Sequence, residues 1–486
     1  MNKPTDTSTE ELTYCNPLPL PDYPRGRASR DRRSSACDAG EQADFRETAD
    51  PSVIWHDGRW YLYPSAGMAY VSEDFVTWRF APMNIYDVGY APTVMEHRGA
   101  FYLTACGAGL YRAVTPLGPW DDKGPILDLD GEPMGLGDPM YFADDDGQVY
   151  LYWGCGGPGI FGCRMDSDDP GRAASRQELL FTYNPDHAWE RFGEFNEDPS
   201  TSWLEGAWMI KIGETYYLTY AAPGTQWRTY GMGVYVSDNP LGPFEYQARN
   251  PILRTTEGLV RGPGHGCIVR GPRDTLWAFY TCTVCYRHPF ERRIGMDPAG
   301  VDEEGYLFVH GASEMPQWAP GVRSRPQDGN DAGPLPLTQA RNCGASSCSP
   351  GRTPSYAIDG SLRTWWQAAE GDAEPWIEID PESVFTVSAA RICWSEPNLN
   401  YDQGVTPGPM RYRIEGRATD ADPWSVLIDR TGNDVDLLID YQTFPAREIR
   451  FARLVVTGAP PGLSVGVADF SLFGKGHPPP PEKYRL

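Results

Sequence analysis

Short apolar strands and polar turns alternate through the first two thirds of the chain, and one phrase recurs among them. The phrase is a polar turn followed by an aromatic-rich strand, and it reads DGRWYLYPS, RGAFYLTAC, DGQVYLYWG, GETYYLTYA and RDTLWAFYT in its five places. A shorter apolar strand precedes each copy, and a third strand with a polar corner follows several of them. Such a unit, repeated five times, is typical of the blades of a β-propeller. An ordinary antiparallel sandwich is the alternative, which five copies in register disfavour.

The pattern changes in the last third of the chain. Residues 321–336 are rich in Pro and Gly without periodicity, which indicates a linker. Residues 337–475 return to short alternating strands such as WIEID and MRYRIEG, which favour a β-sandwich of the jelly-roll type. The polyproline-like end, residues 476–486, is expected to be a disordered tail. The sequence therefore predicts an all-β protein, with a five-bladed β-propeller over residues 1–320 followed by a β-sandwich.

Charge and composition exclude several classes of partner. Asp and Glu number 66 against 42 Lys and Arg, and the resulting net charge of -24 disfavours binding to nucleic acid or to an anionic membrane. No stretch approaches the roughly 20 apolar residues of a membrane span. The opening residues lack the apolar core of a signal peptide, so we expect the chain in the cytoplasm, or outside the cell if a leader preceded it. Eleven scattered cysteines favour reduced thiols over a disulfide framework.

Acidic residues stand at the same place in three of the predicted blades, where the first strand begins. They are Asp50, Asp138 and Glu205, and the fifth blade has His265 there. The first strands of a propeller line its central channel, so these side chains should converge at one mouth. Like charges held close together push pKa values apart, which leaves one carboxyl protonated and another ionised. Glycoside hydrolysis needs that combination of an acid and a base.

Each of these residues also has a plain structural interpretation. An Asp before Pro is common in turns, and a lone His more often makes hydrogen bonds in a core than binds a metal. The occurrence of three acidic residues at one blade position is what favours a catalytic site.

Candidate sugar contacts are less specific. Trp153, Trp203 and Trp227 lie near the predicted loops, where they could stack on a sugar or pack between blades. Arg287, just after the fifth copy of the phrase, could bind sugar hydroxyls or pair with Glu291.

Three segments together resemble a known enzyme family. TADPSVIWHDGRWYLY, GDPMYFADDDGQVYLYW and WLEGAWMIKIGETYYLTYA are similar to the three acidic motifs of glycoside hydrolase family 43. This resemblance implies a five-bladed propeller that inverts the anomeric carbon, with Asp50 as general base, Glu205 as general acid and Asp138 orienting the acid and tuning its pKa. It implies no cofactor for the chemistry, and a structural calcium ion held through water by His265. An insertion before Asp50, rich in Arg and Asp, is expected to reshape the entrance.

The last third resembles a second family. YAIDGSLRTWWQAAEGDAEPWIEID is similar to discoidin-like domains, also called coagulation-factor type C domains and related to carbohydrate-binding module family 32. The resemblance implies a module that binds sugar at loops on one end of the sandwich. Trp365 and Trp366 could serve there as core residues or as ligand contacts. Because no acidic motif lies beyond Gly321, we expect the propeller to be separable and a chain ending near that residue to remain active.

These observations predict an exo-acting glycosidase acting on plant or microbial polysaccharides or oligosaccharides. The resemblance favours release of galactofuranose or arabinofuranose, with a β-xylosidase or an exo-β-1,3-galactanase as alternatives. A retaining enzyme of the invertase type is disfavoured because no Arg precedes Asp138 in an Arg-Asp-Pro motif. An alternative of another class is a non-catalytic carbohydrate-binding protein, against which the complete acidic trio argues.

Overall fold

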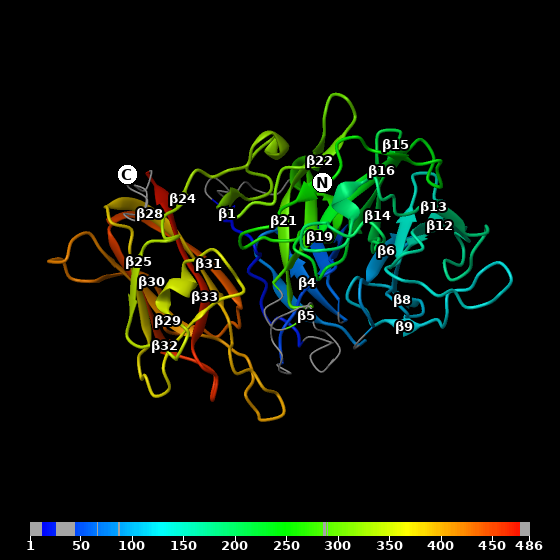
Figure 1. The fold of residues 1–486 in the computed structure, drawn as a ribbon. Helices are drawn as coiled ribbons and strands as arrows, with labels where there is room; N and C mark the ends of the chain where they lie inside the picture. Colours follow the sequence, from blue (N-terminus) through cyan, green and yellow to red (C-terminus); the bar gives the residue numbers. More distant parts are fainter. Residues whose placement is uncertain are drawn as a thin grey trace.

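The repeated phrases fold into five antiparallel sheets, four of them four-stranded and one five-stranded, drawn from blue to green in Figure 1. The structure is a computed structural model, and it describes residues 12–25, 44–65, 67–85, 88–284, 288 and 290–476. Blade one holds β2 (Ser52–His56), β3 (Arg59–Tyr63), β4 (Met68–Ser72) and β5 (Arg79–Pro82), and blade two holds β6 (Thr93–His97), β7 (Ala100–Thr104), β8 (Tyr111–Ala113) and β9 (Asp121–Asp122). Blade three holds β10 (Met140–Ala143), β11 (Val149–Trp153), β12 (Ile160–Met165) and β13 (Glu178–Phe181). Blade four holds β14 (Glu205–Ile212), β15 (Thr215–Ala222), β16 (Gly231–Ser237) and β17 (Glu245–Tyr246) with β18 (Leu253–Arg254) beside β16, and blade five holds β19 (Gly264–Arg270), β20 (Leu276–Thr283), β21 (Arg292–Val301) and β22 (Leu307–Val309).

Tight turns account for the polar start of the repeated phrase. In the two-residue turn Asp57–Gly58, φ is 45° and 82°, and in Arg98–Gly99 it is 49° and 73°. Positive φ at both central residues defines the type I′ turn, whose twist matches that of the two strands it joins. Each phrase therefore folds as a local hairpin, with its aromatic strand buried between neighbouring blades.

The inner strands form a closed ring around the central channel. Strands β2, β6, β10, β14 and β19 each contact the next, and β19 returns to contact β2. Each blade is built from one continuous segment, so the ring closes by packing between its first and last blades. We call this junction of blades one and five the seam.

The last third of the chain folds into two five-stranded antiparallel sheets. One contains β24 (Leu335–Pro336), β33 (Gly466–Lys475), β28 (Phe385–Trp394), β31 (Ile439–Ile449) and, beside β33, β26 (Trp366–Gln367). The other contains β25 (Asn342–Ala345), β27 (Trp376–Asp380), β32 (Phe451–Gly458), β29 (Arg411–Arg417) and β30 (Ser425–Arg430). Buried apolar residues of both sheets share one core, which makes this part a sandwich. Short 3₁₀ turns occur at Ala188–Glu190, Pro272–Asp274, Pro326–Asp328 and Pro354–Ala357.

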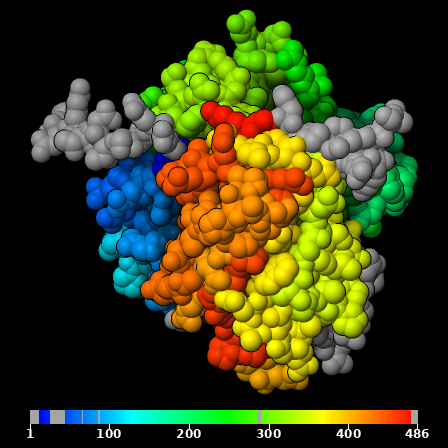
Figure 2. Space-filling model, turned by 90° about the vertical axis from the view of Figure 1, so that its left-hand side faces the viewer, coloured from blue at the N-terminus to red at the C-terminus, as the bar shows by residue number. Residues whose placement is uncertain are grey.

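The sandwich packs directly against the seam. Figure 1 places it beside the strands of blades one and five, and Figure 2 shows its yellow-to-red surface lying against the blue part of the propeller. One cluster of buried apolar residues runs through blade one, blade five and the sandwich. The N-terminal segment joins the same cluster, and its strand β1 (Thr13–Tyr14) pairs with β23 (Gln317–Trp318).

The segment expected as a linker is packed within this assembly. In residues 321–336, Pro326 is buried and the fully buried Asn330 donates a side-chain hydrogen bond to the Trp318 carbonyl at 2.8 Å. Strand β24 at its end pairs with β33 of the sandwich. Composition suggested a free connection, but these contacts give the segment a fixed path.

The all-β prediction is confirmed. Among the described residues, no helix is long and apolar enough to cross a membrane, and the described cysteines carry free thiols. The predicted tail lies outside the described residues, except for Gly476.

Candidate active site

A residue with left-handed backbone stands where the inner strand of every blade begins. Its φ is 54° at Asp50, 51° at Ala91, 48° at Asp138, 63° at Gly206 beside Glu205, and 37° at His265. Residues other than glycine adopt positive φ rarely, and such backbone strain concentrates at functional sites. Because the same bend recurs around a closed ring, the residues at these positions meet at one end of the channel.

Asp50 is buried and tied to both sides of the seam. Its backbone N–H donates to Thr281 Oγ1 at 2.9 Å, and the Ser65 hydroxyl donates to its Oδ2 at 2.6 Å. A guanidinium nitrogen of Arg292 donates to its Oδ1 at 3.0 Å. Burial acts to raise the pKa of Asp50, but Arg292, His265 and the Ser65 hydrogen bond outweigh burial and hold the pKa below its usual value. Asp50 is therefore ionised at neutral pH.

Arg292 joins blade five to the segment that leads into blade one. Besides Asp50, its guanidinium contacts Glu47 Oε2 at 3.3 and 3.4 Å. The aromatic rings of Tyr90 and Phe290 lie over it, with centroids 5.5 and 4.9 Å away. Two carboxylates compensate the burial of this cation, whose side chain is only 5% exposed. This cluster holds Asp50 in place and keeps it charged.

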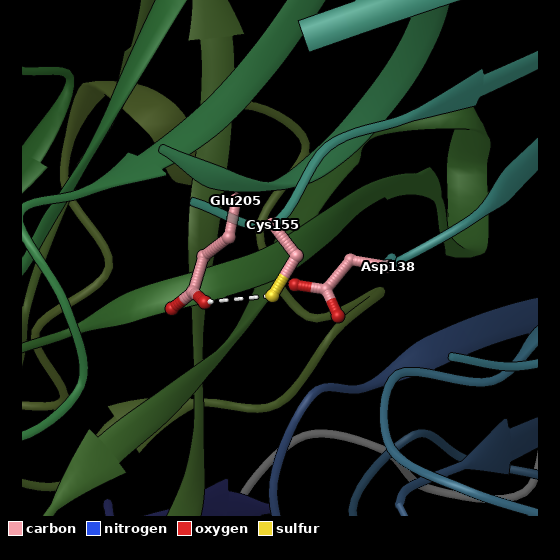
Figure 3. Close-up of side chains that lie close together, drawn as sticks. All are labelled: Asp138, Cys155 and Glu205. Atoms are coloured by element: carbon pink, nitrogen blue, oxygen red, sulfur yellow. Dashed lines mark hydrogen bonds between the residues drawn. The ribbon is translucent and has the colours of Figure 1, made fainter. Parts of the chain in front are cut away.

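The other two carboxyls face each other across the junction of blades three and four. One oxygen of Asp138, one oxygen of Glu205 and the Sγ of Cys155 all lie within 4.8 Å of one another, and Figure 3 shows the thiol between the two carboxyls. The thiol donates to Glu205 Oε2 at 3.8 Å. The Trp203 indole N–H donates to the same oxygen at 2.8 Å, and the Tyr230 hydroxyl donates to Oε1. These donors fix the orientation of Glu205.

Burial raises the pKa of both of these carboxyls. For Asp138 the Glu205 and Asp50 carboxylates add to burial, and together they exceed the opposing effect of His265 and raise the pKa to about 7. For Glu205 burial and the Asp50 charge raise the pKa, although His265 and the Tyr230 hydrogen bond act in the other direction. Two carboxyls this close share protons, so the pair retains one near neutral pH. The site thus combines an ionised carboxylate with a proton-bearing pair.

His265 lies between the two aspartates. Its Nδ1 is 3.4 Å from Asp50 Oδ1 and 3.5 Å from Asp138 Oδ2. Gly206 allows this position, because a Cβ there would lie 2.8 Å from the imidazole Cγ. The histidine therefore bridges carboxyls of two blades that are not neighbours.

The calcium ion that the family resemblance implied, held through water by His265, stays a prediction. Calcium takes about six to eight oxygen ligands. The Nδ1 of His265 faces Asp50 and Asp138. No chemical step below uses a metal.

The three candidate tryptophans have different surroundings. Trp203 is 41% exposed beside Glu205, so its ring is free to contact a sugar. Trp153 is 6% exposed and stacks on Phe161 at a centroid distance of 5.9 Å, so it packs in the core of blade three instead of facing a ligand. Trp153 lies in β11 with buried neighbours on both sides, which explains why it is buried while Trp203 is exposed.

The structure gives less information on Trp227 and Arg287, the other two candidate sugar contacts. Trp227 is half-buried with its ring 6.1 Å from Phe192, and its buried indole nitrogen has no partner among the described residues. Arg287 lies outside the described residues.

The sequence analysis did not identify Ser65, Cys155 or Arg292 as site residues. Strand register could have indicated the first two. Val53 pairs with Leu62, so continuing that antiparallel register places Ser65 opposite Asp50. The same reasoning in blade three, where Met140 pairs with Tyr152, places Gly154 opposite Asp138 and Cys155 one residue further along. Arg292 gave no such signal, because its partners come from outside its own blade.

The Cys155 thiol offers a test of this geometry that does not depend on catalysis. Loss of hydration around the thiol and the Asp138 and Glu205 carboxylates raise the pKa of Cys155 well above its usual value, so little thiolate forms although part of the residue is exposed. Removing one negative charge by Asp138→Asn should lower that pKa and speed alkylation by iodoacetamide, as measured by mass spectrometry at fixed pH. Exposed Cys348 in the sandwich is the internal reference. Equal Cys155 rates in wild type and variant would contradict the arrangement in Figure 3.

Comparison with known proteins gives relatives of modest identity. The chain is 23% identical over 256 residues to the beta-D-galactofuranosidase xynD of Aspergillus niger, covering 45% of this chain and 69% of that protein. It is 28% identical over 301 residues to an arabinoxylan arabinofuranohydrolase of Paenibacillus polymyxa, covering 50% of this chain and 46% of the relative, so it spans less than half of that protein. A solved structure described as a thermostable family-43 glycoside hydrolase aligns with a TM-score of 0.50 at 23% identity, over 64% of this chain and 100% of the other, which supports the propeller fold.

The family assignment rests on a longer match. Residues 47–307, more than half of the chain, match the family described as glycosyl hydrolases family 43. The match begins three residues before Asp50 and takes in all three acidic positions of the ring. The geometry and the match agree on an enzyme that hydrolyses O-glycosyl bonds in carbohydrates, and the chain belongs to glycosyl hydrolases family 43.

Proposed function

We propose that this protein is an inverting, exo-acting glycosidase that releases a terminal furanose, galactofuranose or arabinofuranose, from plant or microbial polysaccharides or oligosaccharides. Asp50 is the general base, Glu205 the general acid, and Asp138 orients the acid and tunes its pKa. The observation that carries this proposal is the electrostatic asymmetry of the site. Arg292 holds Asp50 ionised, while burial and mutual repulsion keep a proton on the pair of Asp138 and Glu205.

In the proposed reaction a water molecule between Asp50 and the sugar gives a proton to Asp50 as its oxygen bonds the anomeric carbon. The bond to the leaving oxygen breaks on the opposite face, and Glu205 transfers its proton to that oxygen. Trp203 and Tyr230 donate to Glu205 and stabilise the carboxylate that forms. Proton exchange with solvent then restores both groups. The chemistry needs only these carboxyls and water.

Inversion is supported by the order of the inner strands. Asp50 precedes β2 and Glu205 begins β14, and β19 lies between those strands on the shorter way round the ring. Inverting enzymes hold their two carboxyls roughly 6.5–9.5 Å apart to admit a water, whereas retaining enzymes hold them about 5–5.5 Å apart. Placement on blades that are not neighbours favours the wider spacing.

A furanose substrate is supported by the relatives. One is named a galactofuranosidase and another an arabinofuranohydrolase. A β-xylosidase or an exo-β-1,3-galactanase of the same family is the alternative. A purely carbohydrate-binding role is disfavoured by the intact acid and base.

Sugar binding by the sandwich stays a prediction. A cleft of about 720 Å³ at one end is lined by residues such as Gln367, Asp372 and Asn398, with no aromatic ring among its described lining. Trp366 is fully buried, and the Arg352 guanidinium covers the ring of Trp365 at 3.4 Å. Neither tryptophan therefore offers a bare face for sugar stacking.

Leaving-group dependence should separate the acid from the base. Glu205→Gln should lower kcat about 10²–10⁴-fold on glycosides with poor leaving groups but much less on dinitrophenyl glycosides, which need no protonation. Asp50→Asn should lower kcat on both by a comparable factor, and its Tm should fall because Arg292 keeps only Glu47. Steady-state kinetics on folded variants are the measurement. A uniform loss in Glu205→Gln would remove it as the acid.

The anomer first released reports the stereochemistry. A panel of aryl furanosides, xylosides and galactosides should identify a furanoside as the preferred substrate, and proton NMR of early time points should show a product of opposite anomeric configuration. A retained anomer would overturn the role of Asp50 as base. If the enzyme prefers a xyloside and still inverts the anomer, the proposed mechanism stands but the proposed furanose substrate is wrong.

The pH profile of kcat/KM should be bell-shaped. Activity appears as pH rises through the lowered pKa of Asp50, which must be ionised, and disappears as pH rises through the raised pKa of the pair, which must hold a proton. Asp138→Asn removes a negative charge beside Glu205, so the basic limb should move to lower pH while the acidic limb stays closer to that of the wild type. An unmoved basic limb would show that Asp138 does not tune the acid.

A further inference from the structure

The sandwich binds the segment that directly precedes Asp50, the proposed base. Arg46, four residues before Asp50, has a side chain that is only 2% exposed. Its Nε and one terminal nitrogen donate to the two oxygens of Glu396 at 2.9 and 2.6 Å. Its two terminal nitrogens also donate to the two oxygens of Asp436 at 2.7 and 3.1 Å. Both carboxylates belong to the sandwich, so a single propeller side chain is fixed by two bidentate ion pairs from the other domain.

The contacts continue without a gap from Arg46 to Asp50. The Arg46 carbonyl accepts from Arg293 at 3.0 Å, and Glu47 holds the guanidinium of Arg292. The backbone N–H of residue 48 donates to the Arg292 carbonyl, and the carbonyl of residue 49 accepts from the Ser65 N–H. Asp50 then bonds Arg292 and Ser65 through its side chain. Every residue of segment 46–50 is therefore held.

Other sandwich contacts reach the same region. The Tyr401 backbone N–H donates to Asp44 Oδ2 at 2.7 Å, two residues before Arg46. On the other side of the junction, buried Arg391 of β28 donates to the Asn16 and Glu314 carbonyls at 2.6 and 3.0 Å. The sandwich thus binds both the segment that enters blade one and the chain around blade five, across the seam where the ring closes.

We propose that the C-terminal sandwich is part of the catalytic architecture: Glu396 and Asp436, through Arg46, are positioning residues that set the place of the base. The proposal rests on the function proposed for Asp50. Charge-assisted bidentate hydrogen bonds have strict geometry, so they fix position more narrowly than apolar packing does. A shift of segment 46–50 would move Glu47 and Asp50 relative to Arg292. This proposal reverses the expectation that the propeller alone is active.

The test is the double variant Glu396→Gln and Asp436→Asn, which keeps side-chain volume and one acceptor on each residue. Glu415→Gln is the matched control, because buried Glu415 also accepts from two arginines, Arg413 and Arg453, but entirely within the sandwich. Displacements near 1 Å can cost about 10²-fold in rate, so kcat should fall about tenfold to a hundredfold in the double variant with KM little changed. The control should retain wild-type kcat.

The acidic limb of the pH profile supplies a readout that partial unfolding does not move. The groups that face Asp50 come from every surrounding element, and they are Arg292, His265, Glu47, Asp138, Glu205, Tyr90 and Tyr230. Of these, Arg292 is the cation whose distance to Asp50 the segment controls. Loosening that pair raises the pKa of the base, so the acidic limb should move to higher pH in the double variant and stay in place in the control.

The outcomes separate this proposal from the proposed function. Wild-type kcat and an unmoved acidic limb in a folded double variant would overturn it, as would a loss of kcat without a shift of the limb, which indicates a merely structural role. If the double variant fails to fold, Asp436→Asn alone, in which Glu396 still holds Arg46, is judged by the same two results. Activity in Asp50→Asn would instead refute the proposed function, whatever the sandwich variants do.

Discussion

One buried cation, Arg292, connects the closure of the ring with the charge of Asp50. Its guanidinium lies between Glu47 and Asp50, at the seam where the first and last blades meet. Taking an arginine out of water is unfavourable unless carboxylates compensate it, so burial of Arg292 requires both partners to remain charged and close. The same requirement keeps Asp50 ionised and oriented. A contact that closes the ring therefore also fixes the charge and orientation of Asp50, the proposed base.

The fold shifts the pKa of Asp50 in the opposite direction from the pKa values of Asp138 and Glu205. Asp50 is buried beside a cation, whereas Asp138 and Glu205 are buried beside each other. Burial alone would raise all three pKa values, and Arg292, helped by His265 and the Ser65 hydrogen bond, lowers that of Asp50 below its usual value. His265 lies 3.4 and 3.5 Å from the two aspartates and acts to lower the pKa of each.

The repeat, the blade count and the acidic trio could be predicted from the sequence because they depend on local patterns. A hairpin phrase and the residue in front of it lie within a few positions of each other. Arg46, Arg292 and Glu396 could not be predicted in the same way, since their partners lie hundreds of residues away and nothing in their own neighbourhoods marks them. Composition was misleading for residues 321–336, because Pro and Gly also suit a packed irregular path. For Trp153, packing into a buried apolar cluster at the end of β11 prevailed over proximity to a loop.

The bend at the start of each inner strand has a consequence for how such sites change. Ala91 adopts the same left-handed conformation as Asp50 and Asp138, yet its methyl group takes part in no acid–base chemistry. The strained backbone is thus a property of the ring and exists before any particular side chain is installed there. Four of the five bends carry a side chain, whereas the fourth blade has Gly206, with Glu205 just before the bend. The ring thus directs side chains from four blades toward the channel whatever their chemistry, and the missing Cβ of the fourth leaves room for the imidazole of His265.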